Sequence, residues 1–313
     1  MQRFTSAFIR EQRGEKNEVD PYHPYAFLVE PECGPNGQVQ DVATLFLTNR
    51  ECPFTCLMCD LWKNTLNSRI PVGTIPQQID YALERMPTAQ SIKLYNSGNF
   101  FDPQAIPPED YPAIAQRMTG FRTVIVENHP RLIGPRCLEF QQLLPAGIEL
   151  EVAMGLETVH QEALAALNKE MTTDDFARAA SFFVENNIAM RAFVLLKPPF
   201  LSEAEGLEWA LKSTEFAFDQ GVRTVAIIPT RGGNGVMEQL ADSRDFSPPS
   251  LRSLEAVLDA GLAMKRGRVF VDLWDAEKLI ECPVCGPKRI ERLQNMNLTQ
   301  CESPRVTCSN CAG

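Results

Sequence analysis

The sequence predicts an α/β fold, namely a partial (β/α)6 barrel of the TIM type with a small cysteine-rich, metal-binding extension at its carboxyl end. Two observations predict it. Short apolar runs alternate with amphipathic segments between residues 42 and 230, which is typical of strand and helix units repeated around a parallel sheet. In addition, eight of the ten cysteines among the 313 residues lie in two groups, one after the first apolar run and one near the end.

Six strands account for the apolar runs. Helix start signals with the spacing of a capping box occur at Thr74, with Gln77 three residues on, and at Ser202, with Glu205 three residues on. Six strand and helix units are enough for a partial barrel. The predicted strands are residues 42–48, 91–96, 122–127, 148–157, 188–197 and 224–230.

The fourth strand alternates apolar and acidic residues. Its apolar face should meet the helices, which directs Glu149, Glu151 and Glu157 toward the barrel interior. Glu157 then lies at the carboxyl end of the strand, where barrels place their chemistry. Carboxylates deep in a barrel need partners, so we expect counter-charges beside Glu149 and Glu151.

The flanking segments complete the predicted organisation. Residues 1–41 form an N-terminal extension that enters the sheet through a hairpin-like turn, and residues 42–235 form the barrel. Residues 236–280 supply a helix and a strand that pack on the barrel. Residues 281–313 form a four-cysteine metal-binding knuckle.

Composition and charge exclude several classes of protein. The apolar runs are far shorter than the ~20 residues of a membrane span, and the start of the chain lacks a secretory signal, so we expect a cytoplasmic protein without a membrane partner. The net charge of -10 argues against binding of nucleic acid over the whole surface. From residue 262 onward, however, there are eight Lys and Arg and six Asp and Glu, which gives this segment a net charge of +2. Binding of RNA to this segment is therefore compatible with the charge.

The front cysteine group consists of Cys52, Cys56 and Cys59, in a C-x3-C-x2-C pattern directly after the first predicted strand. Three thiolates on one short loop can hold three irons of a 4Fe-4S cluster and leave the fourth iron free. A small molecule with adjacent amino and carboxylate groups can then bind that iron. The alternative is a zinc site of three cysteines with a fourth ligand such as His129.

This loop and its position resemble those of the radical SAM superfamily, and the resemblance covers about residues 40–235. It implies a 4Fe-4S cluster and S-adenosylmethionine (SAM) as cofactors, reductive cleavage of SAM to a 5′-deoxyadenosyl radical, and a reductant such as a flavodoxin or ferredoxin. The resemblance also implies a SAM-binding role for polar residues at successive strand ends. They are Asn96, Ser97, Gly98, Asn99, Glu127, Glu157, Asn168 and Lys169.

A narrower resemblance is to the radical SAM subunit of archaeosine synthase, which is related to the radical SAM domain of the elongator catalytic subunit. Its most specific part is the run Leu-Leu-Lys-Pro-Pro-Phe-Leu-Ser-Glu at residues 195–203. It implies that Lys197 faces the active site as a catalytic residue, and that tRNA is the substrate. A small metabolite as substrate, or a non-catalytic metal-binding scaffold, are the alternatives.

The rear cysteine group contains two C-x2-C knuckles, Cys282 with Cys285 and Cys308 with Cys311. Paired knuckles are a strong metal signal, and zinc on four thiolates is the usual occupant. A second iron–sulfur cluster that uses Cys301 is the competing interpretation. We favour zinc, because the two knuckles already complete a closed site of four thiolates.

Overall fold

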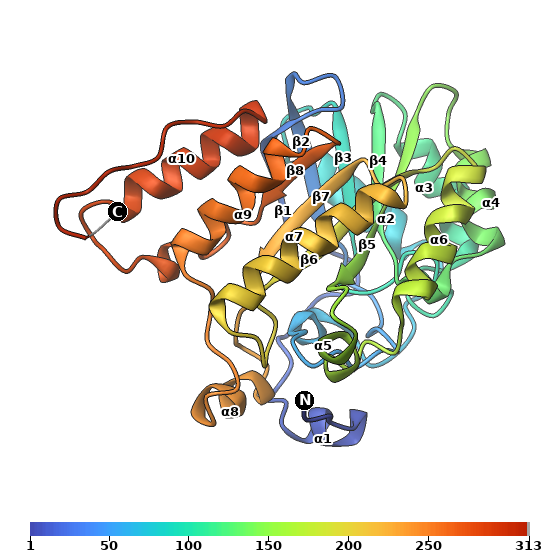
Figure 1. Cartoon of the computed structure of the whole chain (residues 1–313). Coiled ribbons are helices and arrows are strands. Elements are labelled where there is room, and N and C mark those ends of the chain that lie inside the picture. Colours follow the sequence, from blue (N-terminus) through green and yellow to red (C-terminus); the bar gives the residue numbers. More distant parts are fainter. Residues whose placement is uncertain (312–313) are drawn as a thin grey trace.

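Eight strands form one curled sheet in the computed structural model, which describes residues 1–311 (Figure 1). The last two residues of the predicted tail, 312 and 313, lie outside the described residues. The strands follow one another in chain order; β1 is antiparallel to β2, and all later neighbours are parallel. The strands are β1 Ala26–Cys33, β2 Val39–Phe46, β3 Ser91–Tyr95, β4 Thr123–Glu127, β5 Glu149–Glu157, β6 Ala189–Leu196, β7 Thr224–Pro229 and β8 Arg268–Val271.

The predicted fold class is confirmed. Strands β2 to β7 overlap the six predicted strands and lie side by side in parallel. β1 and β8 extend the same sheet at its two edges, and the hairpin-like entry of the N-terminal segment is the antiparallel pair β1–β2. The division into residues 1–41, 42–235, 236–280 and 281–313 stays a prediction.

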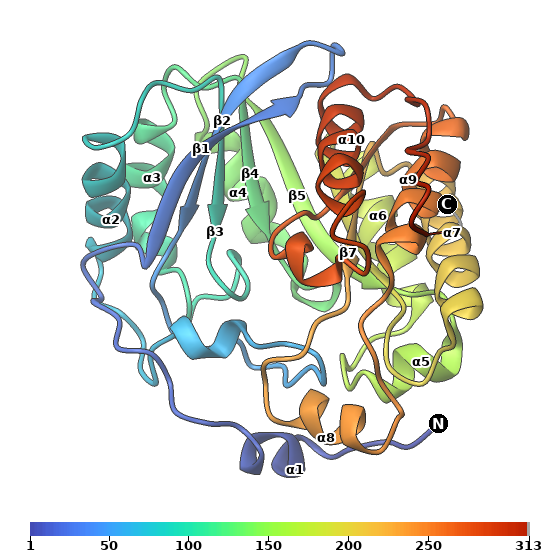
Figure 2. The ribbon, with the colours of Figure 1, turned by 90° about the vertical axis from the view of Figure 1, so that its left-hand side faces the viewer.

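Helices cover the convex face of the sheet and leave the concave face to the interior (Figure 2). α7 and α9 lie against each other over the later strands, and α2, α3 and α4 cover the earlier ones. The helices are α1 Ser6–Glu11, α2 Thr74–Leu83, α3 Tyr111–Arg117, α4 Pro135–Leu143, α5 Gln161–Ala166, α6 Thr173–Glu185, α7 Glu203–Asp219, α8 Val236–Asp242, α9 Leu251–Ala263 and α10 Gly286–Thr299, with short 3-10 turns at Leu61–Asn64, Pro108–Asp110, Pro130–Leu132 and Ala276–Leu279.

Both predicted helix starts are confirmed, but only one of the two capping boxes forms. The capping box of Ser202 and Glu205 opens α7 as expected. At α2, however, the N-cap is Gly73, whose φ is +89°, and Thr74 is already the first helical residue. The reason is a distant contact: the Asp110 carboxylate accepts a hydrogen bond from the Gly73 amide at 2.6 Å and so takes the capping role.

The two faces of the sheet carry different side chains. Outward-facing residues such as Ile92, Leu94 and Val225 are fully buried in the main core under the helices. On the inward face Glu151 finds the counter-charge that its position requires, since its carboxylate lies 2.6 Å from the Arg191 guanidinium. This pair belongs to an ion-pair floor inside the half-barrel, which consists of Glu32, Lys93, Glu151, Arg191 and Arg268.

A second, smaller core lies at the carboxyl ends of the strands. Leu57 of the front cysteine loop is fully buried there against Ile9 of α1 and Leu240 of α8. Figure 2 shows α1 and α8 side by side at this end of the molecule. Segments far apart in the sequence therefore pack around the loop that carries the front cysteines.

α10 occupies the free edge of β8. The Asn297 side chain exchanges two hydrogen bonds with the backbone of Val271, at 2.8 and 3.0 Å, and the Gln300 side chain does the same with Val269, at 2.8 and 2.9 Å. These two amides satisfy backbone groups that an exposed sheet edge would leave unpaired. The same helix also contacts β1 and α9. The tail is thereby tied to the sheet.

Candidate functional site

The front cysteine loop follows β2 and is held at both sides by residues from distant segments. The Asn234 side chain donates hydrogen bonds to the carbonyls of Leu57 and Cys59. The backbone N–H of Leu57 donates to the carbonyl of Leu167 at 2.8 Å. On the N-terminal side of the loop, Glu51 forms ion pairs with Arg13 and Lys16, each at 2.7 Å. The loop therefore has a fixed course over the carboxyl ends of the strands.

The three front thiols are half-buried and stand apart. Burial raises the pKa of Cys52, of Cys56 and of Cys59 to about 12 each. Among the residues that the structure describes, the three sulfurs are not a group that gathers within 4.8 Å. One tetrahedral ion needs thiolates about 3.8 Å apart, given a Zn–S bond of about 2.3 Å. A larger iron–sulfur cube suits this spread arrangement better than a single ion.

The segment after β3 connects directly to this loop. The Asn99 side chain donates a hydrogen bond to the Cys52 sulfur at 3.2 Å, and its oxygen accepts one from the His129 amide at 2.7 Å. The side-chain oxygen of Asn96 is fully buried and has no hydrogen-bond partner within residues 1–311. A buried acceptor without a donor is costly, and a ligand amino group would satisfy it.

Glu127 lies beneath the same segment. Its carboxylate accepts hydrogen bonds from the backbone amides of Asn96, at 2.6 Å, and Gly98, at 3.2 Å. Burial raises the pKa of this carboxyl, and the two amides oppose that rise. Glu127 thus fixes the turn that contains Asn96, Ser97, Gly98 and Asn99.

Glu157 and Lys169 form a buried ion pair beside the cysteines. Their charged atoms lie 2.5 Å apart. Burial disfavours the Lys169 ammonium, but the adjacent Glu157 carboxylate, followed by Cys56, raises the pKa of Lys169 above its usual range. Gly155 makes room for the pair, because a Cβ on this residue would collide with both charged groups. The site therefore holds a buried ion pair near the thiols, in which Lys169 stays protonated.

The structure separates Asn168 and Lys197 from these contacts. The Asn168 side chain donates hydrogen bonds to the Thr55 carbonyl, at 2.7 Å, and the Ser6 hydroxyl, at 3.1 Å, so that it fastens the cysteine loop to the N-terminal segment. The Lys197 ammonium contacts Ser247 at 2.7 Å and Glu203 at 2.8 Å, beside the start of α7. A catalytic role for Lys197 stays a prediction.

His129 is the residue of the site that the sequence suggested only as an alternative zinc ligand. Its Nδ1 accepts a hydrogen bond from the Arg131 amide at 3.1 Å, which leaves Nε2 to donate to the Lys169 carbonyl at 3.0 Å. The ring stacks on Phe54 of the cysteine loop at 3.8 Å, and burial lowers the pKa of His129 to about 3. With both nitrogens engaged, His129 orients the loop and is a poor candidate for the fourth ligand.

The sulfurs of the rear cysteines lie close together, unlike those of the front cysteines. The sulfurs of Cys282, Cys285, Cys308 and Cys311 all lie within 4.8 Å of one another, and those of Cys285 and Cys311 are 3.5 Å apart. A hydrogen bond from the Cys285 amide, followed by one from Val284, lowers the pKa of Cys282 to about 7. This is the donor set and the spacing of one tetrahedral metal ion.

The surroundings of the rear group fit the same geometry. The exposed Cys301 is outside the group of four. The Arg289 guanidinium donates a hydrogen bond to the Cys285 sulfur at 3.3 Å and also contacts Glu255 of α9. Four thiolates around a divalent ion leave negative charge, which Arg289 offsets.

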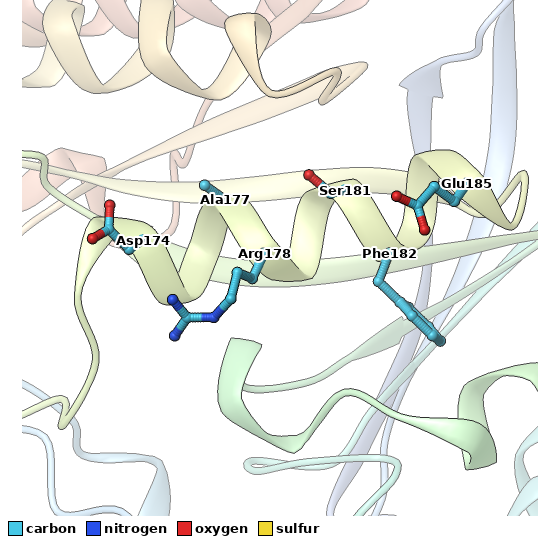
Figure 3. A pocket seen from close by; sticks show the side chains of 6 residues that line it. All are labelled: Asp174, Ala177, Arg178, Ser181, Phe182 and Glu185. Carbon is cyan, nitrogen blue, oxygen red and sulfur yellow. The ribbon is translucent and has the colours of Figure 1, made fainter.

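A hollow of about 550 Å³ lies elsewhere, along α6 (Figure 3). Every residue that lines it belongs to this one helix, and none of them is a predicted site residue. We assign it no part in the chemistry. The lining residues are Asp174, Ala177, Arg178, Ser181, Phe182 and Glu185.

Comparison with known proteins gives both relatives and structural neighbours. No family model matches the chain. An uncharacterised protein of Methanocaldococcus jannaschii is 25% identical over 93% of this chain and 86% of its own length. Archaeosine synthase subunit beta of Thermococcus kodakarensis is 28% identical over 65% of each chain, so this chain spans slightly less than two thirds of that relative.

Two solved structures share the fold. Methylornithine synthase (PylB) superposes with a TM-score of 0.53 and 14% identity, over 86% of this chain and 75% of its own. Archaeal Elp3 of Methanocaldococcus infernus gives a TM-score of 0.52 and 15% identity, over 72% of this chain and 60% of its own. This chain therefore shares its fold with methylornithine synthase and archaeal Elp3.

The helices of residues 1–311 are each too short or too polar to cross a lipid bilayer.

Proposed function

We propose that the protein is a radical SAM enzyme in which Cys52, Cys56 and Cys59 hold a 4Fe-4S cluster. The observation that carries the proposal is the front loop itself: three spread thiols at the carboxyl ends of parallel strands, with an Asn99 hydrogen bond to one sulfur. When bound, such a cluster supplies the electron that cleaves SAM into methionine and a 5′-deoxyadenosyl radical.

The residues around the loop fit the methionine end of SAM. The unpartnered oxygen of Asn96 suits the amino group, and the Lys169 ammonium suits the carboxylate. Glu127 keeps the Asn96 turn in place, while Glu157 keeps Lys169 charged. We assign Ser97, Gly98, Asn99 and Asn168 the supporting role of fixing this turn and the loop.

For the substrate, we propose a base in tRNA. The support is the similarity to archaeosine synthase subunit beta and to Elp3, together with the excess of basic residues from residue 262 onward. A reductant such as a flavodoxin or ferredoxin would supply the electron. A small metabolite remains the alternative, and the acidic charge of the rest of the chain favours it.

In the tail, we propose zinc on Cys282, Cys285, Cys308 and Cys311. The convergent sulfurs support one ion, and their contact with α10 gives it a structural role. A second iron–sulfur cluster could also use four thiolates, but it would need their sulfurs farther apart than in this group.

Anaerobic reconstitution with iron and sulfide, followed by dithionite and SAM, tests the enzyme class. We expect a 4Fe-4S absorbance and formation of 5′-deoxyadenosine; absence of both would refute the proposal. Gel shifts with tRNA test the substrate. Binding that weakens steeply with salt supports tRNA, whereas failure to bind at any salt concentration supports the small metabolite.

A further inference from the structure

A row of aromatic side chains lines the concave face of the half-barrel. The rings of Tyr25, Phe46 and Tyr95 follow one another with centroids 5.6 and 6.4 Å apart, and Phe193 continues the row 6.2 Å from Tyr95. Trp274, just beyond β8, meets Phe46 at 5.6 Å. We call these five residues the aromatic row.

The aromatic row is partly accessible to solvent, although it lies inside the sheet's curve and burial raises the pKa of Tyr95 above its usual range. Phe46, Tyr95 and Phe193 each keep accessible surface, while their outward neighbours Leu45, Leu94 and Val194 have almost none. Ala226 and Ile228, the inward residues of β7, also keep accessible surface. The row therefore faces accessible space rather than the packed core.

Trp274 stands at the rim with its ring partly exposed and its backbone fixed. More than half of its surface (54%) is exposed. Its amide donates a hydrogen bond to Asp272 at 3.0 Å, and its carbonyl accepts one from Arg231 at 2.6 Å. An exposed indole on a fixed backbone presents a ready stacking surface at little cost in entropy.

At its inner end the aromatic row reaches the candidate active site. The Tyr25 hydroxyl and the Ser97 hydroxyl share a hydrogen bond of 2.8 Å. Ser97 belongs to the turn that Glu127 fixes beside the front cysteines. A flat group stacked along the row would thus lie between the rim and the site of the chemistry.

The cations near the aromatic row are already paired. Arg231 pairs with Asp272 at the rim, Lys169 with Glu157 at the site, and Arg191 with Glu32 and Glu151 in the floor. The row therefore offers ring faces and no unpaired cation, and the nearby Glu127 carboxylate is held by two backbone amides. Such a surface suits a neutral planar ring better than a charged aliphatic chain.

We propose that the aromatic row binds the planar ring of a nucleobase, with Trp274 as its stacking residue. The proposal rests on the proposed function and deepens it, since it names the residues that bind the substrate's base. Stacking on one aromatic ring contributes enough to change affinity about tenfold.

The test is calorimetric titration of the reconstituted, full-length enzyme, in the presence of SAM, with guanosine, tryptophan and lysine as separate probes. We expect guanosine to bind and lysine not to bind. Trp274→Ala should weaken guanosine binding about tenfold, and Trp274→Phe should restore most of it. The control is Trp209→Ala, because Trp209 contacts Lys212 and His160 on the outer helix α7 and should leave binding unchanged.

Three outcomes would overturn the inference: no guanosine binding by the wild-type enzyme, binding of tryptophan or lysine in its place, or equal affinity of Trp274→Ala and wild type. Deoxyadenosine formation by the wild-type enzyme is measured in parallel. Its absence would refute the proposed function, whereas the titration alone decides what the aromatic row binds.

Discussion

The molecule carries two cysteine groups that differ in how their sulfurs are arranged and in the pKa of their thiols. The front thiols stand apart and have their pKa raised to about 12 by burial. The rear thiols converge within 4.8 Å; backbone amides lower the pKa of Cys282 to about 7, while hydrogen bonding with Cys285 raises the pKa of Cys311 to about 11. The proposed function gives the two arrangements different tasks: spread thiols for a cluster with an open iron, and convergent thiols for one closed ion.

The difference extends to what each group holds in place. Around the front loop, contacts arrive from α1, α8 and the strand ends, so the loop depends on the finished fold. The rear group lies at the start of α10, and that helix completes the edge of β8. We infer that loss of the front ligands removes activity, and that loss of the rear ligands weakens the structure.

The largest expected effect comes from Cys56→Ala. It removes one of three front ligands, and we expect deoxyadenosine formation to fall by at least about 100-fold. Mass spectrometry of the products measures it. Cys301→Ala is the matched control, because Cys301 is exposed and outside both groups. Equal loss in the two variants would contradict the account.

The next largest effect should follow Lys169→Met. This change leaves the Glu157 carboxylate buried without its partner, and we expect a loss of about 3 kcal/mol in the free energy of unfolding. Adding Glu157→Gln removes the stranded charge and should recover most of that loss, while SAM binding stays weak. Urea denaturation and SAM titration separate the two readouts. If the double variant recovers SAM binding as well, Lys169 has no role in holding SAM.

For the rear group, Cys308→Ser should lower the melting temperature by roughly 3 °C, which corresponds to a free-energy change of about 2 kcal/mol in a chain of this size. The reason is that α10 loses the anchor at its start. Thermal unfolding of anaerobically purified protein measures the shift. An unchanged melting temperature would mean that the rear metal does not support the fold.

The smallest effect is a dependence of stability on pH through His129. Burial lowers its pKa to about 3, whereas the unfolded chain has a pKa of about 6.5. Below pH 6.5 the unfolded state therefore binds a proton that the folded state does not, and stability falls as the pH falls, by up to about 1.4 kcal/mol per pH unit. His129→Asn should reduce the dependence of the free energy of unfolding on pH between pH 6.5 and 5. Urea denaturation at a series of pH values measures this dependence. If the variant shows the same dependence as the wild type, His129 is not its source.

The sequence predicts the fold well because local patterns decide it. Six apolar runs of strand length, each followed by an amphipathic segment, define β2 to β7, and the cysteine spacings define both cysteine groups. The features that the sequence does not predict are long-range contacts. The capping of α2 by Asp110, the hydrogen bonds of Asn297 and Gln300 to β8, and the engagement of His129 join residues that sequence spacing does not connect.

The most direct test of the central claim is the metal content of the full chain, purified without oxygen, as wild type, Cys56→Ala and Cys308→Ser. We predict about four irons and about one zinc per wild-type chain. Cys56→Ala should lose iron and keep zinc, and Cys308→Ser should lose zinc and keep iron. Loss of both metals in either variant, or loss of iron in Cys308→Ser, would contradict the assignment of different metals to the two cysteine groups.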